Sequence, residues 1–320
     1  MNKSMDISIV VPLFNEDESL TELEAWVDRV LKAHNLSYEL ILVDDGSNDN
    51  SWTVVEELSK KNSFVRGIKF RRNYGKSAAL YSGFEAAQGN VIITMDADLQ
   101  DSPDEVPELY NMIINEGFDI VSGWKKKRHD PFIKRITSKF YNGTTRFVTG
   151  IKLNDMNCGL KAYRNNVIKS IEVYGEMHRY IPVLAKQAGF TKIGEKVVEH
   201  RARQYGVTKF GLERFINGFL DLMSVVFMTR FGNKPMHFFG LWGSLMFLFG
   251  GMVATYLIAQ KIYFLSFTDL IPRDVTDQPL FYLSLVAVLV GVQLFLAGFT
   301  GELISRNGQD RNNYLIEKTV

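Results

Sequence analysis

The sequence has little cysteine, no excess of charge and no glycine-rich phosphate loop. Its single cysteine, Cys158, cannot form an internal disulfide and is typical of a reducing compartment. The formal net charge of +1 gives no overall electrostatic reason to expect a nucleic-acid partner. Neither a Gly-x-Gly-x-x-Gly nor a Walker A pattern is present. Asp6 interrupts the start before any apolar signal-peptide core, so we expect the N-terminal domain to stay in the cytoplasm.

Charged side chains are frequent up to about residue 235 and sparse beyond it. The stretches 238–259 and 280–301 contain no charged residue, and about 20 apolar residues suffice to span a bilayer. We therefore predict a transmembrane hairpin over 236–304, followed by a cytoplasmic tail over 305–320. The alternative is a pair of buried helices in a soluble protein. Basic side chains flank the ends that we place in the cytoplasm, as is usual for multi-pass proteins of the inner (plasma) membrane: Arg230, Lys234, Arg306 and Arg311.

The segment 210–235, just before the first predicted span, has the pattern of an amphipathic helix. Its apolar residues recur at helical spacings, with polar residues between them: Phe215, Phe219, Leu222, Val226 and Phe227. One interpretation is a juxtamembrane helix that lies in the plane of the membrane interface. The other is a helix that packs against the core of the soluble domain.

Residues 1–209 alternate short apolar runs with helical patterns. The runs predicted as strands are rich in β-branched residues: 7–11, 40–43, 65–70, 91–95 and 119–122. The helical patterns between them cover 19–33, 50–61, 77–87 and 103–116. This alternation predicts an α/β domain with a mostly parallel sheet that is covered on both faces. In such sheets ligands bind beyond the carboxyl ends of the strands.

The strongest chemical signal follows the apolar run 91–95. Asp96 and Asp98, two residues apart at the end of a strand, can offer carboxylate oxygens to one hard cation such as Mg²⁺. The alternative is a solvated turn that caps a helix starting at Pro103, although Ser102 could provide that cap by itself.

A second acidic pair, Asp44 and Asp45, follows another predicted strand. Carboxylates there could hydrogen-bond a nucleobase or ribose hydroxyls, as acidic residues do in dinucleotide sites. The alternative is a tight turn in which Gly46 supplies a positive φ, and both can be true together. The segment 12–16, after the first strand, makes a third loop on the same edge.

Taken in order, these motifs resemble family 2 glycosyltransferases of the GT-A (Rossmann-like) fold. Within that family the sequence is similar to the polyprenyl-phosphate hexosyltransferase group, which includes dolichol-phosphate mannose synthase and bactoprenol glucosyltransferase. The matching segments are 12–16, 44–47, 73–76, 96–101, 155–164, 177–182 and 203–209. The resemblance covers nearly the whole chain, and two C-terminal spans occur in the bacterial members.

The resemblance implies roles for individual residues. A Mg²⁺ or Mn²⁺ ion would be held by Asp96, Asp98 and Gln100. The nucleotide-sugar would contact Pro12, Asn15, Glu16, Asp44, Asp45, Lys76, Asp96 and Ala97. The catalytic group would include Asp98, Asp155, Arg203 and Lys209. The acceptor phosphate would contact Lys125, Lys134, Arg135, Ser138, His178 and Arg179. For Lys125, Lys134 and Arg135 the alternative is a solvated basic loop, and for His178 it is a structural histidine.

Two departures from the family pattern bear on mechanism. Residues 206–209 read Gly-Val-Thr-Lys, which keeps a hydroxyl and the final lysine but loses a polar group. Asp155 is followed by Met156 and Asn157, where the wider family has an acidic pair that supplies a base. A phosphate monoester is already largely ionised near pH 7, so a phosphate acceptor does not require that base. Asp155 is then an orienting group or a weak base.

The sequence therefore predicts inverting transfer of a hexose or related sugar from a UDP- or GDP-linked donor to polyprenyl phosphate at a lipid bilayer. One alternative is a tethered transferase with a soluble or glycan acceptor, and another is a non-enzymatic nucleotide-sugar sensor or scaffold. A processive polysaccharide synthase is disfavoured because no Gln-x-x-Arg-Trp motif is present. Small residues in the first span could also support a homo-oligomer: Gly240, Gly243, Gly250 and Gly251.

Overall fold

The computed structural model describes residues 5–126, 142–173, 175, 177–201, 223–224, 227, 231, 234–267 and 273–307. The chain divides into two compact units, Met1–Val226 and Phe227–Val320. The boundary expected at residue 209 and most of the predicted amphipathic helix over 210–235 lie outside the described residues.

In the described part of the first unit, seven strands form one sheet in the order β3-β2-β1-β4-β6-β5-β7. The strands are β1 Ile7–Leu13, β2 Tyr38–Asp44, β3 Val65–Lys69, β4 Val91–Thr94, β5 Ile120–Trp124, β6 Lys161–Arg164 and β7 Ile193–Val197. Only β6 runs antiparallel to its neighbours, β4 and β5, among these strands. This mixed sheet with a parallel core confirms the predicted fold class.

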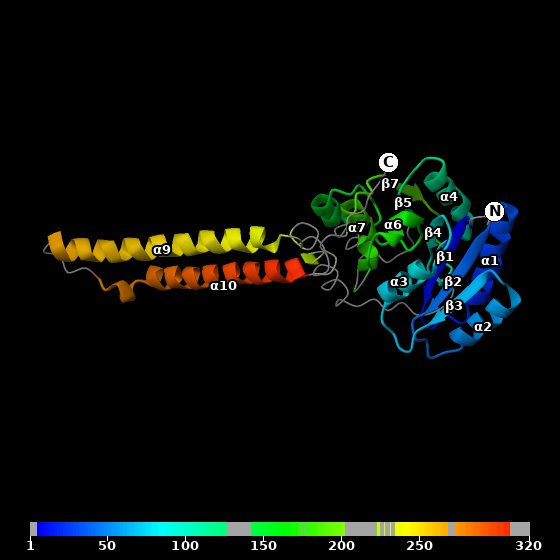
Figure 1. Cartoon of the computed structure of the whole chain (residues 1–320), viewed down its shortest axis with the longest axis horizontal. Coiled ribbons are helices and arrows are strands. Elements are labelled where there is room, and N and C mark those ends of the chain that lie inside the picture. Colours follow the sequence, from blue (N-terminus) through cyan, green and yellow to red (C-terminus); the bar gives the residue numbers. More distant parts are fainter. Residues whose placement is uncertain are drawn as a thin grey trace. The chain divides into compact units, whose positions relative to one another are not determined.

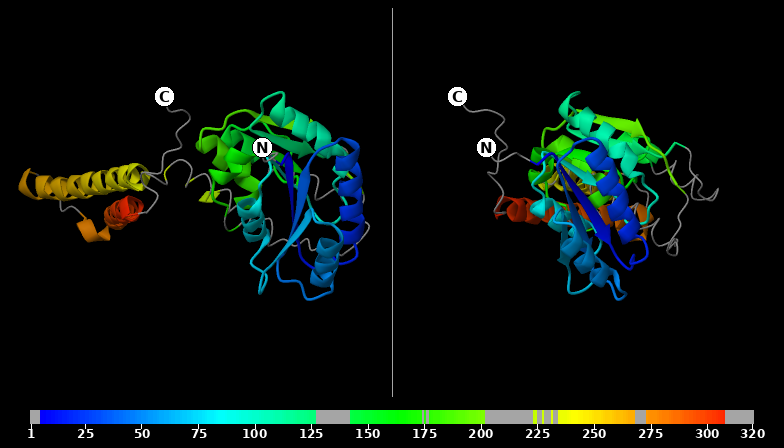
Figure 2. Two further views of the ribbon diagram at one scale, coloured as in Figure 1. Left: turned by 45° about the vertical axis from the view of Figure 1, so that its right-hand side comes forward. Right: turned by 90° about the vertical axis from the view of Figure 1, so that its right-hand side faces the viewer.

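Helices cover both faces of the sheet (Figures 1 and 2). On one face lie α1 Leu20–Ala33, α2 Ser51–Lys61 and α4 Val106–Ile114, the last preceded by the 3₁₀ turn η1 Pro103–Glu105. On the other lie α3 Lys76–Ala86, α6 Asn165–Lys169 and α7 Ile181–Gln187, the last preceded by the 3₁₀ turn η2 Met177–Tyr180. Residues 142–149 are also helical.

Strand β1 shows why the sheet is covered twice. Ile9 packs into the core under α1, and Val10 packs into the core under α3, so successive side chains are buried on opposite faces. The strand pairs in register with β2 on one side, up to Leu13 beside Asp44, and with β4 on the other, up to Val10 beside Thr94. The loops that leave β1, β2 and β4 therefore start at one edge of the sheet.

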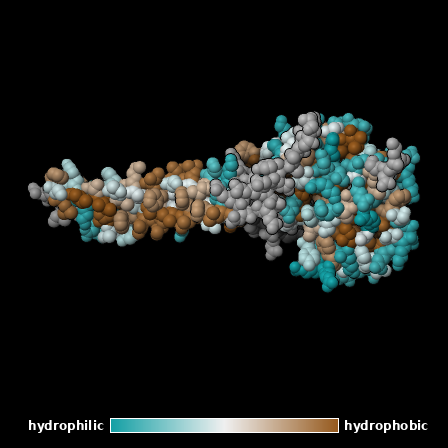
Figure 3. Space-filling model, viewed as in Figure 1, coloured by the Kyte–Doolittle hydropathy of each residue, from teal (hydrophilic) through white to brown (hydrophobic). Residues whose placement is uncertain are grey.

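The second unit contains two long helices, α9 Pro235–Phe267 and α10 Pro279–Asn307, with the short turn η3 Val275–Asp277 between them. Both helices are long and apolar enough to cross a membrane. Figure 3 shows hydrophobic residues over much of their visible surface. The predicted spans 238–259 and 280–301 lie inside α9 and α10.

Glycines let α9 and α10 approach closely. A Cβ on Gly243 would lie 2.7 Å from the backbone oxygen of Gly291, and one on Gly250 would lie 2.5 Å from the backbone oxygen of Ser284. A Cβ on Gly251, in contrast, would meet nothing within 4 Å. Two of the four small residues from which the sequence suggested contacts between copies, Gly243 and Gly250, are therefore used inside the hairpin.

Replacing Gly250 with leucine should separate α9 from α10, because the new side chain meets the backbone of α10. Overpacking of this kind costs about 1–3 kcal/mol. The measurement is the midpoint of heat-induced loss of monodisperse protein in detergent, which should fall. Gly251→Leu is the matched control, since it changes the neighbouring residue on the open side. Equal midpoints for the two variants would contradict the close packing at Gly250.

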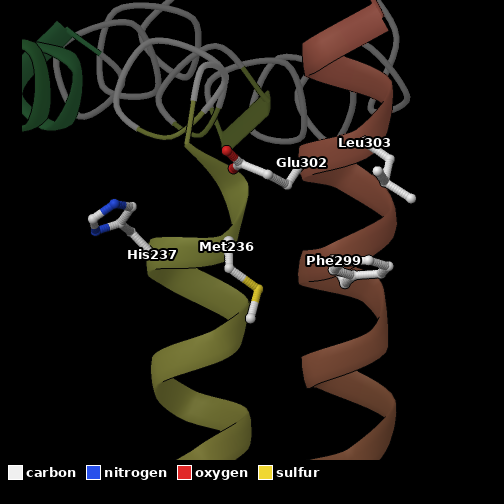
Figure 4. A pocket seen from close by; sticks show the side chains of 5 residues that line it. All are labelled: Met236, His237, Phe299, Glu302 and Leu303. Atoms are coloured by element: carbon white, nitrogen blue, oxygen red, sulfur yellow. The ribbon is translucent and has the colours of Figure 1, made fainter.

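A cavity of about 450 Å³ lies in the hairpin and is lined by Met236, His237, Phe299, Glu302 and Leu303. Figure 4 shows the carboxylate of Glu302 extending from α10 towards the first turn of α9. The lining of this cavity contains a single carboxylate among mostly apolar groups. Such a lining does not match the ligands that a nucleoside diphosphate and its cation need.

Candidate functional site

A second cavity, of about 410 Å³, lies at the carboxyl edge of the parallel strands. It is lined by the end of β1, by the segments that follow β1, β2, β3 and β4, by the first residue of α3 and by one residue of η2: Pro12, Leu13, Phe14, Glu16, Asp45, Asn73, Gly75, Lys76, Asp96, Ala97, Asp98 and His178. Strand β1 lies between β2 and β4, so the cavity is at the point where the strand order reverses. Open α/β sheets bind their ligands at this point.

The loops after β1 and β2 hold each other in place. Asn15 has a positive φ of 57°, donates its backbone N–H to Ser47 Oγ at 2.9 Å and accepts from the Asn48 N–H at 2.9 Å through Oδ1. Asp44 is fully buried and accepts from the Ser47 N–H at 2.8 Å. Asn15 and Asp44, both predicted to contact the nucleotide-sugar, are not among the residues that line the cavity.

Gly46 is required in this turn. Its φ is +74°, and a Cβ there would lie 2.4 Å from the backbone carbon of Arg72. The loop after β2 is thereby pressed against the loop after β3.

Asp45 lines the cavity and also fixes the loop after β3. Its two carboxylate oxygens accept from the backbone N–H groups of Tyr74 at 2.7 Å and Gly75 at 2.9 Å. Burial raises the pKa of Asp45, and the two backbone donors act in the opposite direction. Asp45 therefore positions Lys76, which starts α3.

Lys76 forms an ion pair with Asp96, at 2.5 Å between Nζ and Oδ1. Both side chains remain about one-third exposed, at 36% and 33%. Burial acts to raise the pKa of Asp96, but Lys76 and Lys125 outweigh it and hold that pKa at about 2. Asp96 is thus a firmly ionised carboxylate.

Asp98 is the second carboxylate of the same loop and lines the same cavity. Its Oδ1 accepts from the Gln100 N–H at 3.2 Å, and Leu99 between them has a positive φ of 58°. Within the described residues no three His, Cys, Asp or Glu side chains form a group that could hold a metal. Two carboxylates fit a Mg²⁺ or Mn²⁺ ion that keeps open positions for phosphate oxygens. Gln100, the third predicted ligand, is not among the lining residues.

Lys125, predicted to bind the acceptor phosphate, forms a buried ion pair with Asp101. Nζ and Oδ1 are 2.7 Å apart, with the side chains 13% and 0% exposed. Burial acts to lower the pKa of Lys125, but the Asp101 carboxylate outweighs burial, so the pKa is raised above its ordinary value. In this structure the charge of Lys125 is thus matched by a partner inside the protein.

Asp155 is fully buried and does not line the cavity. Its Oδ1 accepts from the Asn157 N–H at 3.2 Å, so the carboxylate helps to shape its own loop. Lys161 lies in the matching segment 155–164 but was assigned no role. It is 4% exposed and donates to the backbone oxygens of Met156 at 3.1 Å and Cys158 at 2.5 Å. Lys161 therefore holds the loop that carries Asp155.

The remaining predicted residues divide into three groups. His178 lines the cavity and hydrogen-bonds Ser77, which sequence reasoning missed. Arg179 is partly buried in η2 and is not among the lining residues. The other predicted contacts lie outside the described residues: Lys134, Arg135, Ser138, Arg203 and Lys209.

Two named proteins are similar in sequence to nearly the whole chain. A protein named dodecaprenyl-phosphate galacturonate synthase, from Rhizobium johnstonii, is 35% identical over 95% of this chain and 89% of its own length. A protein named undecaprenyl-phosphate 4-deoxy-4-formamido-L-arabinose transferase, from Proteus mirabilis, is 33% identical over 98% of this chain and 94% of its own length.

Solved structures show the same fold. Glucosyl-3-phosphoglycerate synthase from Mycobacterium tuberculosis, crystallised with Mn²⁺, uridine-diphosphate and phosphoglyceric acid, matches 70% of this chain and 78% of its own. The TM-score is 0.54 at 18% identity. Residues 8–172, just over half of the chain, match the family described as glycosyl transferase family 2. This chain belongs to glycosyl transferase family 2.

Proposed function

We propose that this protein transfers a hexose or related sugar from a nucleotide-diphospho-sugar to a polyprenyl phosphate such as undecaprenyl phosphate, with inversion at the anomeric carbon. The observation that carries the proposal is the cavity at the strand switch point, in which Asp96 and Asp98 stand beside Lys76. The names of the two relatives, which match nearly the whole chain, support a lipid-phosphate acceptor.

The lining of the cavity suits the two parts of the donor. Pro12, Glu16 and Asp45 would hold the nucleoside end, and Lys76 would neutralise charge on the diphosphate. Mg²⁺ or Mn²⁺, held by Asp96 and Asp98, would stabilise the negative charge that develops on the leaving diphosphate. Gln100, Arg203 and Lys209 stay predicted additions to this group.

The acceptor needs little activation. The phosphate oxygen of a polyprenyl phosphate is already ionised near pH 7 and can attack the anomeric carbon directly. A single displacement then inverts that carbon. Because Asp155 is buried and does not line the cavity, its arrangement agrees with the orienting role rather than with that of a base.

The setting would be the inner membrane. The helices α9 and α10 would anchor the protein as a hairpin, with the catalytic domain in the cytoplasm where nucleotide-sugars are made. The basic segment that includes Lys134, Arg135 and Ser138 would meet the phosphate of the lipid acceptor.

The test is transfer of radiolabel from a panel of nucleotide-sugars into undecaprenyl phosphate that is extractable into organic solvent. The panel would hold UDP-glucose, UDP-galacturonic acid, UDP-4-deoxy-4-formamido-L-arabinose and GDP-mannose. Labelled lipid that disappears on chelation of divalent cations is the expected result. Hydrolysis of a donor or labelling of a water-soluble glycan, without labelled lipid, would instead favour the soluble-acceptor alternative.

A further inference from the structure

Ser77 and His178 form a hydrogen-bonded pair at the wall of the candidate cavity. Ser77, in the first turn of α3, is 1% exposed. Its Oγ accepts from the backbone N–H of His178 at 3.1 Å and lies 3.0 Å from His178 Nδ1. His178 comes from η2, which packs against α3 about 100 residues later in the chain. The pair therefore joins two elements that lie apart in sequence.

Counting protons fixes the tautomer of His178. The Ser77 hydroxyl has one proton, and among the described residues His178 is its only hydrogen-bond partner. A buried hydroxyl that donates to nothing costs about 1–3 kcal/mol, so the proton goes to Nδ1. An imidazole that accepts at Nδ1 is neutral and carries its own proton on Nε2. Ser77 thus makes Nε2 a donor.

The charges around His178 agree with a neutral ring. Burial lowers the pKa of His178 well below its ordinary value, and the cations Lys76, Arg179 and Lys161 lower it further, against Asp96, which raises it. The contacts of the ring also locate it in the cavity. Its partner Ser77 directly follows Lys76 in α3, and Lys76 pairs with Asp96, so His178 lies on the side of this ion pair, where the diphosphate would bind.

We infer that His178 recognises the transferred sugar by donating a hydrogen bond from Nε2 to one of its oxygens, and that Ser77 sets the tautomer that permits this. The inference rests on the proposed function, because it requires a nucleotide-sugar in the cavity. Phosphate oxygens attract cations such as Lys76, whereas a neutral donor suits a hydroxyl or carbonyl oxygen. The assignment moves His178 from the acceptor phosphate, where the sequence placed it, to the donor sugar.

Three variants of the full-length protein test this role. His178→Phe keeps a ring of similar shape without a donor, and His178→Gln restores an N–H near the position of Nε2. Ser77→Ala leaves the histidine but frees its tautomer. The measurement is affinity, in Mg²⁺ and detergent and without lipid acceptor, for UDP and for UDP-galacturonic acid, with GDP and GDP-mannose in parallel.

For the sugar that the wild type binds, His178→Phe should weaken the nucleotide-sugar about tenfold, the loss of one hydrogen bond to a buried donor, and leave the free nucleotide unchanged. His178→Gln should recover most of the loss, and Ser77→Ala should fall between them. Equal weakening of nucleotide and nucleotide-sugar would mean a diphosphate contact and overturn the inference. So would unchanged binding with a higher KM for polyprenyl phosphate. If the wild type bound none of the four ligands, the proposed function would fail first.

Discussion

Asp98→Asn should lower the rate of sugar transfer by about 100-fold or more, the usual cost of removing a group that stabilises developing charge. Asparagine has nearly the same shape as aspartate, so the fold should survive. What is lost is one of the two carboxylates that line the cavity at the end of β4. With one carboxylate instead of two, the loop should hold Mg²⁺ or Mn²⁺ more weakly.

The measurement is the initial rate of lipid labelling as a function of Mn²⁺ concentration, with membrane fractionation to show that the variant is still inserted. Glu116→Gln is the matched control, because it removes an exposed carboxylate after α4 that does not line the cavity. Full activity of Asp98→Asn would remove the metal role from this loop. A wild-type rate that is insensitive to chelation would do the same.

The sheet could be predicted where strands are apolar on both faces. The runs at β1, β2 and β4 are continuous, and the structure places strands there. Strand β6 was missed because it starts with Lys161 and ends with Arg164. Charged residues at both ends of a four-residue segment hide the apolar pattern of a buried strand. The buried ammonium of Lys161 is tolerated only because two carbonyl groups from the preceding loop accept from it.

Strand β7 was missed for a different reason. Within the described residues it pairs with β5 alone, at the edge of the sheet. Its first four residues are partly buried and Val197 is exposed. An edge strand of sequence Ile-Gly-Glu-Lys-Val has neither the apolar run nor the alternation on which strand prediction depends.

The site could be located from sequence, but its internal partners could not. Strand ends followed by acidic residues pointed to the correct edge of the sheet. Which acid of the pair Asp44 and Asp45 faces the cavity depends on where β2 ends. A shift of that end by one residue would exchange the two side chains, and sequence patterns do not place strand ends that accurately. The partner of Lys125 is Asp101, 24 positions away, and no local spacing reveals an ion pair between two loops.

Gly159 illustrates a residue whose importance only the structure shows. It precedes β6, and its backbone oxygen accepts from Thr94 Oγ1 at 2.8 Å, which ties the loop to β4. A Cβ at Gly159 would lie 2.5 Å from Oδ2 and 2.7 Å from Cγ of Asp96. The carboxylate of Asp96 therefore rests directly on the Cα of a glycine.

Gly159→Ala should consequently cost activity far more than stability. The methyl group can be accommodated if the Asp96 carboxylate turns away, but that movement breaks its contact with Lys76 and its alignment with Asp98. Misplacing the groups that position the reactants by about 1 Å can cost about 100-fold in rate, and we expect a loss of that order. Steady-state transfer and Mn²⁺ dependence measure the loss, and thermal unfolding of the same sample measures stability.

Gly143→Ala is the control, since a Cβ there meets nothing within 4 Å. A Gly159→Ala protein that transfers sugar at the wild-type rate would show that the position of the Asp96 carboxylate does not limit the reaction. One that fails to fold would contradict the expectation that the Asp96 carboxylate can turn away from the new methyl group.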